Sequence, residues 1–196
     1  MIERVETSLQ TQHGSFRILC YDEGPSSLPD FVLIKGDVEG RSNVLTRIQS
    51  ECITGHVLQS LSCDCYEQLQ HSLSQISRAP EGILIYLRQE GRGIGLADKL
   101  RSYVLQKRGF DTVDANLELG HGVDDRSYAA GVRILNDLAV ASVVLMTNNP
   151  SKSAGVEAGG IAVEGTIEVP PVVREQNLRY LETKRGRMGH ILHLPE

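Results

Sequence analysis

Several features that mark other classes of protein are missing from this sequence of 196 residues. It has no tryptophan and only 5% aromatic residues, which argues against a protein that stacks the bases of single-stranded nucleic acid. No apolar run approaches the ~20 residues of a membrane-spanning helix. Residues 1–6 lack the basic and then apolar layout of a signal peptide. We therefore expect a cytoplasmic protein that has no membrane or nucleic-acid partner.

Positive charge is also scarce. The 25 acidic residues outnumber the 20 basic ones and give a net charge of −5, which argues against a nucleic-acid coat or a membrane-surface binder. Among the basic residues, 15 are arginine and five are lysine. Because the planar guanidinium group pairs with phosphate and carboxylate oxygens in a bidentate manner, this excess of arginine favours an anionic small ligand.

The length and the hydropathy pattern predict one domain over residues 1–196. Alternating or continuous apolar runs predict strands, and apolar residues at helical spacing predict helices. Strands are expected at residues 15–21, 31–36, 44–48, 82–87 and 142–147, and helices at 66–76, 96–108, 128–138 and 178–185. Because strands and helices alternate, we expect an α/β fold, a single layered domain with a mixed β-sheet flanked by helices.

Three of the four cysteines form a pattern that favours a metal site. Cys52, Cys63 and Cys65 follow the spacing Cys-x10-Cys-x-Cys, and thiolates are preferred ligands of Zn²⁺. A catalytic zinc keeps three protein ligands and one position for water, which suits three cysteines. Cys20 differs, because it lies on an alternating strand and is expected to be a small buried side chain.

The neighbours of these cysteines leave the type of site open. Glu51 and Asp64 are candidate bases, because three thiolates outweigh the charge of Zn²⁺ and acidify a bound water less than three imidazoles do. His56 is an alternative fourth ligand that would close the site and make the zinc structural. A further alternative is that the three thiols only pack against one another. The spacing favours zinc but does not distinguish an open site from a closed one.

Residues 89–95, Gln-Glu-Gly-Arg-Gly-Ile-Gly, follow a predicted strand and open a predicted helix. Gly91, Gly93 and Gly95 allow backbone N–H groups to approach an anion, and the helix N-terminus adds positive potential. Arg92 within the segment favours phosphate. The segment lacks the dinucleotide-binding fingerprint, and the chain has no Gly-x4-Gly-Lys-Ser/Thr loop. An ordinary turn is the alternative interpretation.

Two further polar segments lie next to predicted helices. Residues 147–152, Thr-Asn-Asn-Pro-Ser-Lys, end a predicted strand, where open α/β sheets bind ligands. A helix cap at Asn149 followed by Pro150 explains part of this segment without a ligand. Asp124 and Asp125 precede the helix predicted from residue 128, where acidic residues commonly complement the helix dipole. Each signal is weak by itself, and their occurrence beside the cysteine pattern strengthens them.

Taken together, these motifs resemble those of GTP cyclohydrolase II. The matching segments keep the family's order and separations across essentially the whole chain: residues 47–52 (RIQSEC), 63–65 (CDC), 88–96 (RQEGRGIGL), 111–116 (DTVDAN), 147–150 (TNNP), and Lys184 with 188–190 (MGH). The length suits the free-standing form of the family. The resemblance implies hydrolysis of GTP at C8 of the imidazole ring, with release of formate and pyrophosphate. The implied product is 2,5-diamino-6-ribosylamino-4(3H)-pyrimidinone 5′-phosphate, made in the first step of riboflavin biosynthesis.

The resemblance also implies roles for residues and cofactors. The three cysteines of the pattern would bind one Zn²⁺ per subunit, Mg²⁺ would accompany the triphosphate, and the assembly would be a homodimer. Asp124 would be the proton acceptor, and Tyr103 would assist the ring chemistry. Arg126 would act at the α-phosphate as a nucleophile or a charge clamp, and a pKa above ~12 favours the clamp. The implied GTP contacts are Arg47, Ile48, Gln49, Ser50, Glu51, Gln68, Glu90, Gly91, Arg92, Thr112, Thr147 and Lys152.

The sequence departs from the family's pattern in three places. His56 stands where relatives often carry an acidic residue, residues 153–160 are rich in glycine where the family has a firmer helix, and residues 163–168 lack the usual arginine after a glutamate. One alternative is therefore a paralogue with another product or pathway, such as an azapteridine or a related secondary metabolite. Two others are a non-catalytic nucleotide sensor with a structural zinc and a dinucleotide-binding oxidoreductase built on the three glycines.

Overall fold

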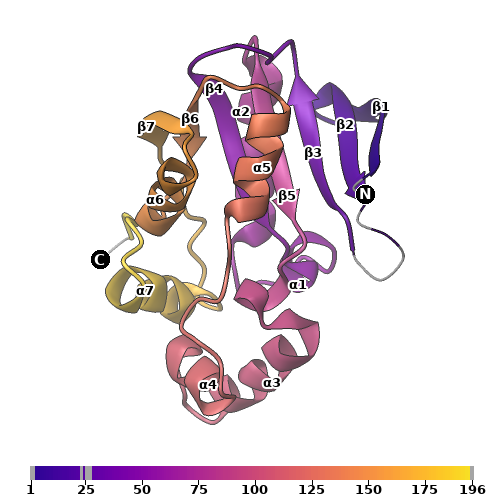
Figure 1. Cartoon of the computed structure of the whole chain (residues 1–196). Coiled ribbons are helices and arrows are strands. Elements are labelled where there is room, and N and C mark those ends of the chain that lie inside the picture. The colour runs from indigo at the N-terminus through magenta and orange to yellow at the C-terminus, as the bar shows by residue number, and fades with distance from the viewer. Residues whose placement is uncertain (1–2, 23, 25–27, 195–196) are drawn as a thin grey trace.

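The computed structural model describes residues 3–22, 24 and 28–194, and within these residues seven strands form one sheet (Figure 1). The strand order is β1-β2-β3-β5-β4-β6-β7. The pairs β1/β2, β2/β3 and β3/β5 are antiparallel, whereas β5/β4, β4/β6 and β6/β7 are parallel. The mixed sheet of the prediction is confirmed. Its strands are β1 (Glu3–Thr11), β2 (Gly14–Asp22), β3 (Asp30–Lys35), β4 (Val44–Ser50), β5 (Gly82–Leu87), β6 (Ser142–Met146) and β7 (Ala162–Ile167).

Helices cover the sheet and extend beyond one of its ends (Figure 1). Helix α5 crosses the face of the sheet that is nearer the viewer and α2 lies behind it, while α3, α4 and α7 lie below the strands. Among the described residues, no helix is both long enough and apolar enough to cross a membrane. The helices are α1 (Ile53–His56), α2 (Cys65–Arg78), α3 (Gly95–Lys107), α4 (Thr112–Glu118), α5 (Ala129–Asp137), α6 (Pro150–Ala158) and α7 (Leu178–Arg187), with a 3₁₀ turn, η1 (Glu90–Gly93).

Strand β5 shows why a continuous apolar run was the right signal for a central strand. Side chains of successive strand residues point to opposite faces of a sheet. Ile83 and Ile85 belong to the core that includes Leu135 of α5. Leu84 belongs to the core on the other face, which includes Ile76 of α2. Because both faces of β5 are covered, every residue of the strand is buried.

The parallel arrangement of β4, β5 and β6 gathers the sequence motifs at one edge of the sheet. Ser50, Leu87 and Met146 end these strands. The segments that follow them contain Cys52, the glycine-rich turn and the Thr-Asn-Asn-Pro motif. Ligands of α/β sheets bind at the carboxyl ends of such strands. The topology therefore places these three segments together.

The prediction omitted β1, α1, α4 and β7 and was wrong in two further details. The two edge strands have few buried residues, so they lack the alternation that marks a half-buried strand. Cys20 is half-buried rather than buried, because it pairs with Val5 of the exposed edge strand β1. The glycine-rich stretch does not lack a firm helix, since α6 continues to Ala158 and Gly159 follows as its C-cap.

Gly159 sets the distance between α6 and α5. A Cβ atom at this position would lie 2.6 Å from both Cγ atoms of Val132, which is a buried residue of α5. We expect Gly159→Ala to lower the free energy of unfolding by about 1–3 kcal/mol, because the core has no room for another methyl group. Urea unfolding measures this loss. Gly186→Ala in α7, where a Cβ would meet nothing within 4 Å, is the control and should not lose stability.

Candidate active site

A cavity of about 400 Å³ lies where β4, β5 and β6 end, and this size is typical of a small-molecule site. Its walls come from the segments after these strands and from α2, α3, α4 and α7. Most of the residues that the sequence singles out line it together: Arg47, Gln49, Ser50, Glu51, Cys52, Cys63, Cys65, Gln68, Glu90, Gly91, Arg92, Tyr103, Thr112, Arg126, Thr147 and Lys152.

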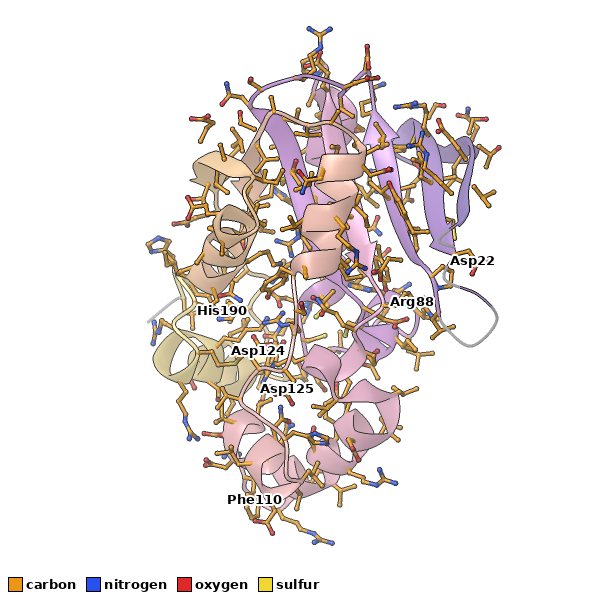
Figure 2. The ribbon with its side chains drawn as sticks, viewed as in Figure 1. Asp22, Arg88, Phe110, Asp124, Asp125 and His190 are labelled. Carbon is orange, nitrogen blue, oxygen red and sulfur yellow. The ribbon has the colours of Figure 1, made fainter. Side chains whose placement is uncertain are left out.

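Ile48 and Asp124, to which the resemblance gives roles at the site, do not line the cavity. The side chain of Ile48 is fully buried in the core, and its backbone carbonyl accepts a hydrogen bond of 2.7 Å from Lys152 Nζ. Asp124 lies beside Arg126, whose Nε donates to Asp124 Oδ1 at 2.7 Å. Figure 2 shows Asp124 below the ends of the central strands, near α7. Ile48 thus supports the site through its backbone, and Asp124 supports it through Arg126.

The three predicted metal ligands come together. The sulfur atoms of Cys52, Cys63 and Cys65 all lie within 4.8 Å of one another, and Cys52 Sγ is 3.9 Å from Cys63 Sγ. Two sulfurs bound tetrahedrally to Zn²⁺ at ~2.3 Å are about 3.8 Å apart, so the spacing fits such an ion. A Cβ atom on Gly55 would lie 3.0 Å from Cys63 Sγ, which explains why α1 carries glycine there. This cluster could hold a metal ion.

The three thiols differ in the direction in which their pKa values are shifted. Hydrogen bonds from the Cys63 and Cys65 thiols, together with the ammonium group of Lys99, lower the pKa of Cys52. The same hydrogen bond with Cys52 raises the pKa of Cys63 to about 11, and Cys65 is raised as well. Cys52 is therefore the first of the three to ionise, and a metal ion replaces the protons of the other two.

His56 lies outside the cysteine cluster, and its ring nitrogens have other partners. Nδ1 is 2.8 Å from Tyr86 Oη, and Nε2 is 3.2 Å from Gln49 Nε2. Burial lowers the pKa of His56, so the ring is neutral at pH 7. Among the described residues, the cluster of possible metal ligands contains only the three cysteines. This geometry favours a site with an open fourth position.

The two candidate bases differ in their surroundings. Glu51 lines the cavity, and its Oε1 forms an ion pair of 3.0 Å with Arg88 Nη1. Burial raises the pKa of Glu51. Asp64 is fully buried outside the cavity lining, and its Oδ2 accepts a hydrogen bond of 2.8 Å from Gln68 Nε2. Of the two, Glu51 is the carboxylate that a bound ligand can reach.

The glycine-rich segment forms a strained turn rather than a regular helix start. Gly91, Arg92 and Gly93 have φ angles of 64°, 66° and 95°. A left-handed conformation is uncommon for arginine and costs about 1–3 kcal/mol. The turn directs Arg92 to the cavity, where its buried Nη1 has no hydrogen-bond partner. An unpaired guanidinium N–H in a cavity is suited to an anionic ligand.

Two tyrosine rings hold further cations at the cavity. Arg126 lies 6.0 Å and Lys152 lies 5.6 Å from the centre of the Tyr128 ring. Burial, with Arg47 and Arg126 close by, lowers the pKa of Lys152 well below its usual value. An anionic ligand would reverse this effect, because it would favour the charged lysine.

The second ring belongs to Tyr180 of α7, whose centre is 4.3 Å from Lys184 Nζ and 5.7 Å from the guanidinium carbon of Arg92. His190, which Figure 2 shows between α6 and α7, also lines the cavity. Burial and the neighbouring cations Lys184 and Arg126 lower the pKa of His190 to about 3. The sequence analysis gave these α7 residues no site role. The spacing of Tyr180 and Lys184, four residues apart on a predicted helix, was a usable signal.

The asparagines after β6 line the cavity, and their side chains form hydrogen bonds within the protein. Asn149 caps α6, since its side chain accepts a hydrogen bond of 3.0 Å from the Ser151 backbone N–H, and Pro150 follows as the first helical residue. Asn148 exchanges two hydrogen bonds of 2.7 Å with the backbone of Val169. The helix-cap interpretation of this segment is confirmed.

Comparison with known proteins identifies the family. The family model described as GTP cyclohydrolase II matches residues 3–168. The chain is 48% identical over 97% of its length to a riboflavin biosynthesis protein RibBA of Salinispora arenicola, of which it covers 46%. It is 46% identical over 97% of its length to a probable monofunctional riboflavin biosynthesis protein, RIBA 3, chloroplastic, of Oryza sativa subsp. japonica, of which it covers 36%. The chain belongs to the GTP cyclohydrolase II family.

Family membership confirms the resemblance seen in the sequence, and it is inconsistent with a dinucleotide-binding oxidoreductase. The chain spans about half the length, or less, of these curated relatives. The comparisons therefore establish the family of this chain.

Tyr103 is suited to a test of the ring chemistry by a small change. Its hydroxyl lines the cavity 3.2 Å from Thr54 Oγ1, and the sulfur of Cys52 is 3.7 Å from the same Oγ1. If this chain catalyses the ring opening that the resemblance implies, we expect Tyr103→Phe to lose about 10²-fold in its rate, the contribution typical of one proton-transfer group, and to bind metal as the wild type does. Metal analysis and formate release measure the two effects. Tyr66→Phe, which makes the same change outside the cavity lining, is the control and should turn over as the wild type does. Wild-type turnover of Tyr103→Phe would show that its hydroxyl group is dispensable.

Proposed function

We propose that this chain is a zinc-dependent GTP cyclohydrolase II. It would open the imidazole ring of GTP at C8 and release formate and pyrophosphate, leaving 2,5-diamino-6-ribosylamino-4(3H)-pyrimidinone 5′-phosphate. The observation that carries the proposal is one cavity lined both by the three-sulfur cluster and by Arg47, Arg92, Arg126 and Lys152. A purine triphosphate needs both parts, because its ring carbon is a weak electrophile and its phosphates carry negative charge. Family membership supports the same reaction.

The end of the cavity that contains the cysteine cluster would catalyse the opening of the imidazole ring. A Zn²⁺ ion held by the three cysteines supplies Lewis acidity for activating water. Glu51, next to Cys52 in the chain and in the lining, is placed to accept the proton that water loses on attack at C8. Tyr103 is placed to give a proton to a ring nitrogen as the bond from C8 breaks. Loss of C8 as formate consumes a second water molecule.

The end of the cavity that contains the arginines and Lys152 would bind the triphosphate and catalyse release of pyrophosphate. A third water molecule attacks the α-phosphorus and leaves the 5′-monophosphate, and the α–β bridging oxygen departs with the pyrophosphate, taking negative charge that cations stabilise. Arg126 is oriented by Asp124, because Nε and Nη2 both donate to this carboxylate, at 2.7 and 2.5 Å. Although burial opposes ionisation, these hydrogen bonds lower the pKa of Asp124 and raise that of Arg126, so both stay charged. We therefore assign Arg126 to charge stabilisation, with Mg²⁺ on the triphosphate, and Asp124 to holding it.

Mass spectrometry of GTP incubated with the zinc-loaded protein and Mg²⁺ tests the proposal. Formate together with the diaminopyrimidinone monophosphate would support it. A product that retains its formyl group would contradict the full reaction and favour the paralogue with an altered product. Untouched GTP, with the metal still bound, would favour the nucleotide sensor.

We also propose a cytoplasmic homodimer. Leu96, Leu100 and Val104 lie on successive turns of α3 with 36%, 48% and 51% of their surface exposed. Such apolar stripes are uncommon on the surface of a monomer. All four cysteines are free thiols, as expected in a reducing compartment. Sedimentation analysis at micromolar concentration would show a mass of two chains, and a monomer would contradict the assembly.

A further inference from the structure

A buried lysine on α3 lies against the cysteine cluster and has no part in the reaction proposed above. Lys99 is 8% exposed. Its Nζ donates hydrogen bonds to Cys52 Sγ at 3.1 Å and to Glu90 Oε1 at 2.7 Å. Burial of an ammonium group is unfavourable unless charged or polar partners surround it. A lysine with a metal-ligand sulfur as one of its partners therefore points to a role at the metal site.

Glu90 holds this lysine in place. Its Oε1 also accepts a hydrogen bond of 2.6 Å from the Gly91 backbone N–H, and its Oε2 accepts one from the backbone N–H of Ile53, the residue after Cys52. Both carboxylate oxygens are thus occupied by groups of the protein. The carboxylate of Glu90, which the family resemblance assigns to GTP, is instead used to connect η1, α3 and the segment of Cys52.

We propose that Lys99, fixed by Glu90, is a positioning residue that orients the Cys52 sulfur and offsets the negative charge of the three-thiolate site. This inference rests on the proposed function, because it requires a metal ion at the cysteines. Three thiolates and one divalent ion carry a net charge of −1. The ammonium nitrogen of Lys99 lies 3.1 Å from one of these sulfurs, so its positive charge attracts the thiolate directly. Hydrogen bonds to ligand atoms fix their direction and tune the metal that they bind.

The first experiment measures Zn²⁺ affinity by competition with a chelator, without nucleotide. We expect Lys99→Met to raise the Kd for Zn²⁺ by about 10- to 100-fold, which is the usual effect of removing an outer partner of a metal ligand. Lys99→Arg keeps a charged N–H donor and should restore most of the affinity. Arg108→Met, an exposed cation at the end of the same helix, is the matched control and should bind Zn²⁺ as the wild type does.

The second experiment separates a role at the metal from a general structural role. In the Co²⁺-loaded protein, the sulfur-to-cobalt charge-transfer band reports the energy of the sulfur lone pairs. An N–H···S hydrogen bond stabilises these electrons, so Lys99→Met is expected to shift the band to longer wavelength, and Lys99→Arg to shift it back. A residue that only packs α3 would leave the band unchanged.

If Lys99→Met does not fold, because Glu90 is left unpaired, the double variant Glu90→Gln/Lys99→Met removes the buried charge and serves for both measurements. A folded variant with the wild-type Kd and the wild-type band would overturn the role of Lys99 and leave the proposed function intact. A wild-type protein that binds neither Zn²⁺ nor Co²⁺ would overturn the proposed function, and this inference with it. The two failures are therefore distinguishable.

Discussion

Cys63→Ser is expected to abolish opening of the imidazole ring of GTP. The substitution removes one of three soft ligands, and a hydroxyl group in the same position is a poor ligand for Zn²⁺ at pH 7. Activation by a metal is worth several kcal/mol in the transition state, so its loss should lower the rate by on the order of 10³-fold or more. Formate release under saturating GTP, together with the zinc content of the purified protein, measures the effect.

A matched control uses the cysteine outside the cluster. Cys20→Ser makes the same chemical change on β2, at a half-buried position, and should keep both zinc and turnover. The cluster assignment also predicts that Cys52→Ser and Cys65→Ser behave like Cys63→Ser. Formate release by a metal-free triple variant would disprove the zinc-dependent mechanism.

The centre of the fold was predictable from the sequence because its signal is local. Residues 82–87 form one continuous apolar run, and the structure places β5 at Gly82–Leu87 with both faces covered. The edge strand β7 was missed, since none of its residues is buried and the sequence AVEGTI does not alternate between apolar and polar residues. Strands of this kind are determined by pairing with a neighbour, here β6, which a pattern in one segment does not contain.

The cysteine cluster was predictable for a similar reason. Cys63 and Cys65 are close in the chain. The short helix α1 lies between Cys52 and Cys63 and reverses the direction of the chain, so that the three cysteines meet. The position of His56 was not predictable, because it depends on Tyr86 and Gln49, which lie on neighbouring strands. A ligand and a bystander at the same spacing look alike in a sequence, and only the direction of the side chain separates them.

Two lysines of the site, Lys99 and Lys184, received no role from the sequence, whereas Lys152 did. Lys99 and Lys184 lie on helices whose apolar spacing predicts a core face, and both side chains turn to the cavity instead. Lys99 is four residues before Tyr103, so the helical period already placed the two on one face. The sequence did not show which groups Lys99 contacts, because Glu90 and Cys52 belong to other segments of the chain.

Arg126→Ala is expected to impair the phosphate half of the reaction more than the ring half. Arg126 and Lys152 flank the same tyrosine ring, so removal of one guanidinium weakens the positive field where we place the triphosphate. Loss of a preorganised cation typically costs about 10²- to 10³-fold in rate. We expect a loss of this size in pyrophosphate release and a raised KM for GTP, with an unchanged zinc content.

Two further variants decide how Arg126 acts. Arg126→Lys keeps the charge but lacks the fork that Asp124 holds, so a clamp should retain part of its effect in this variant. A nucleophile at residue 126, whether a guanidinium or an amine, would instead form a nucleotidyl adduct that mass spectrometry of the protein detects. Arg185→Ala on the exposed side of α7 is the control for loss of one positive charge, and it should turn over GTP as the wild type does. Unchanged kinetics in Arg126→Ala would remove this residue from the mechanism, and partial activity in Arg126→Lys with no nucleotidyl adduct on the protein would support a role by charge.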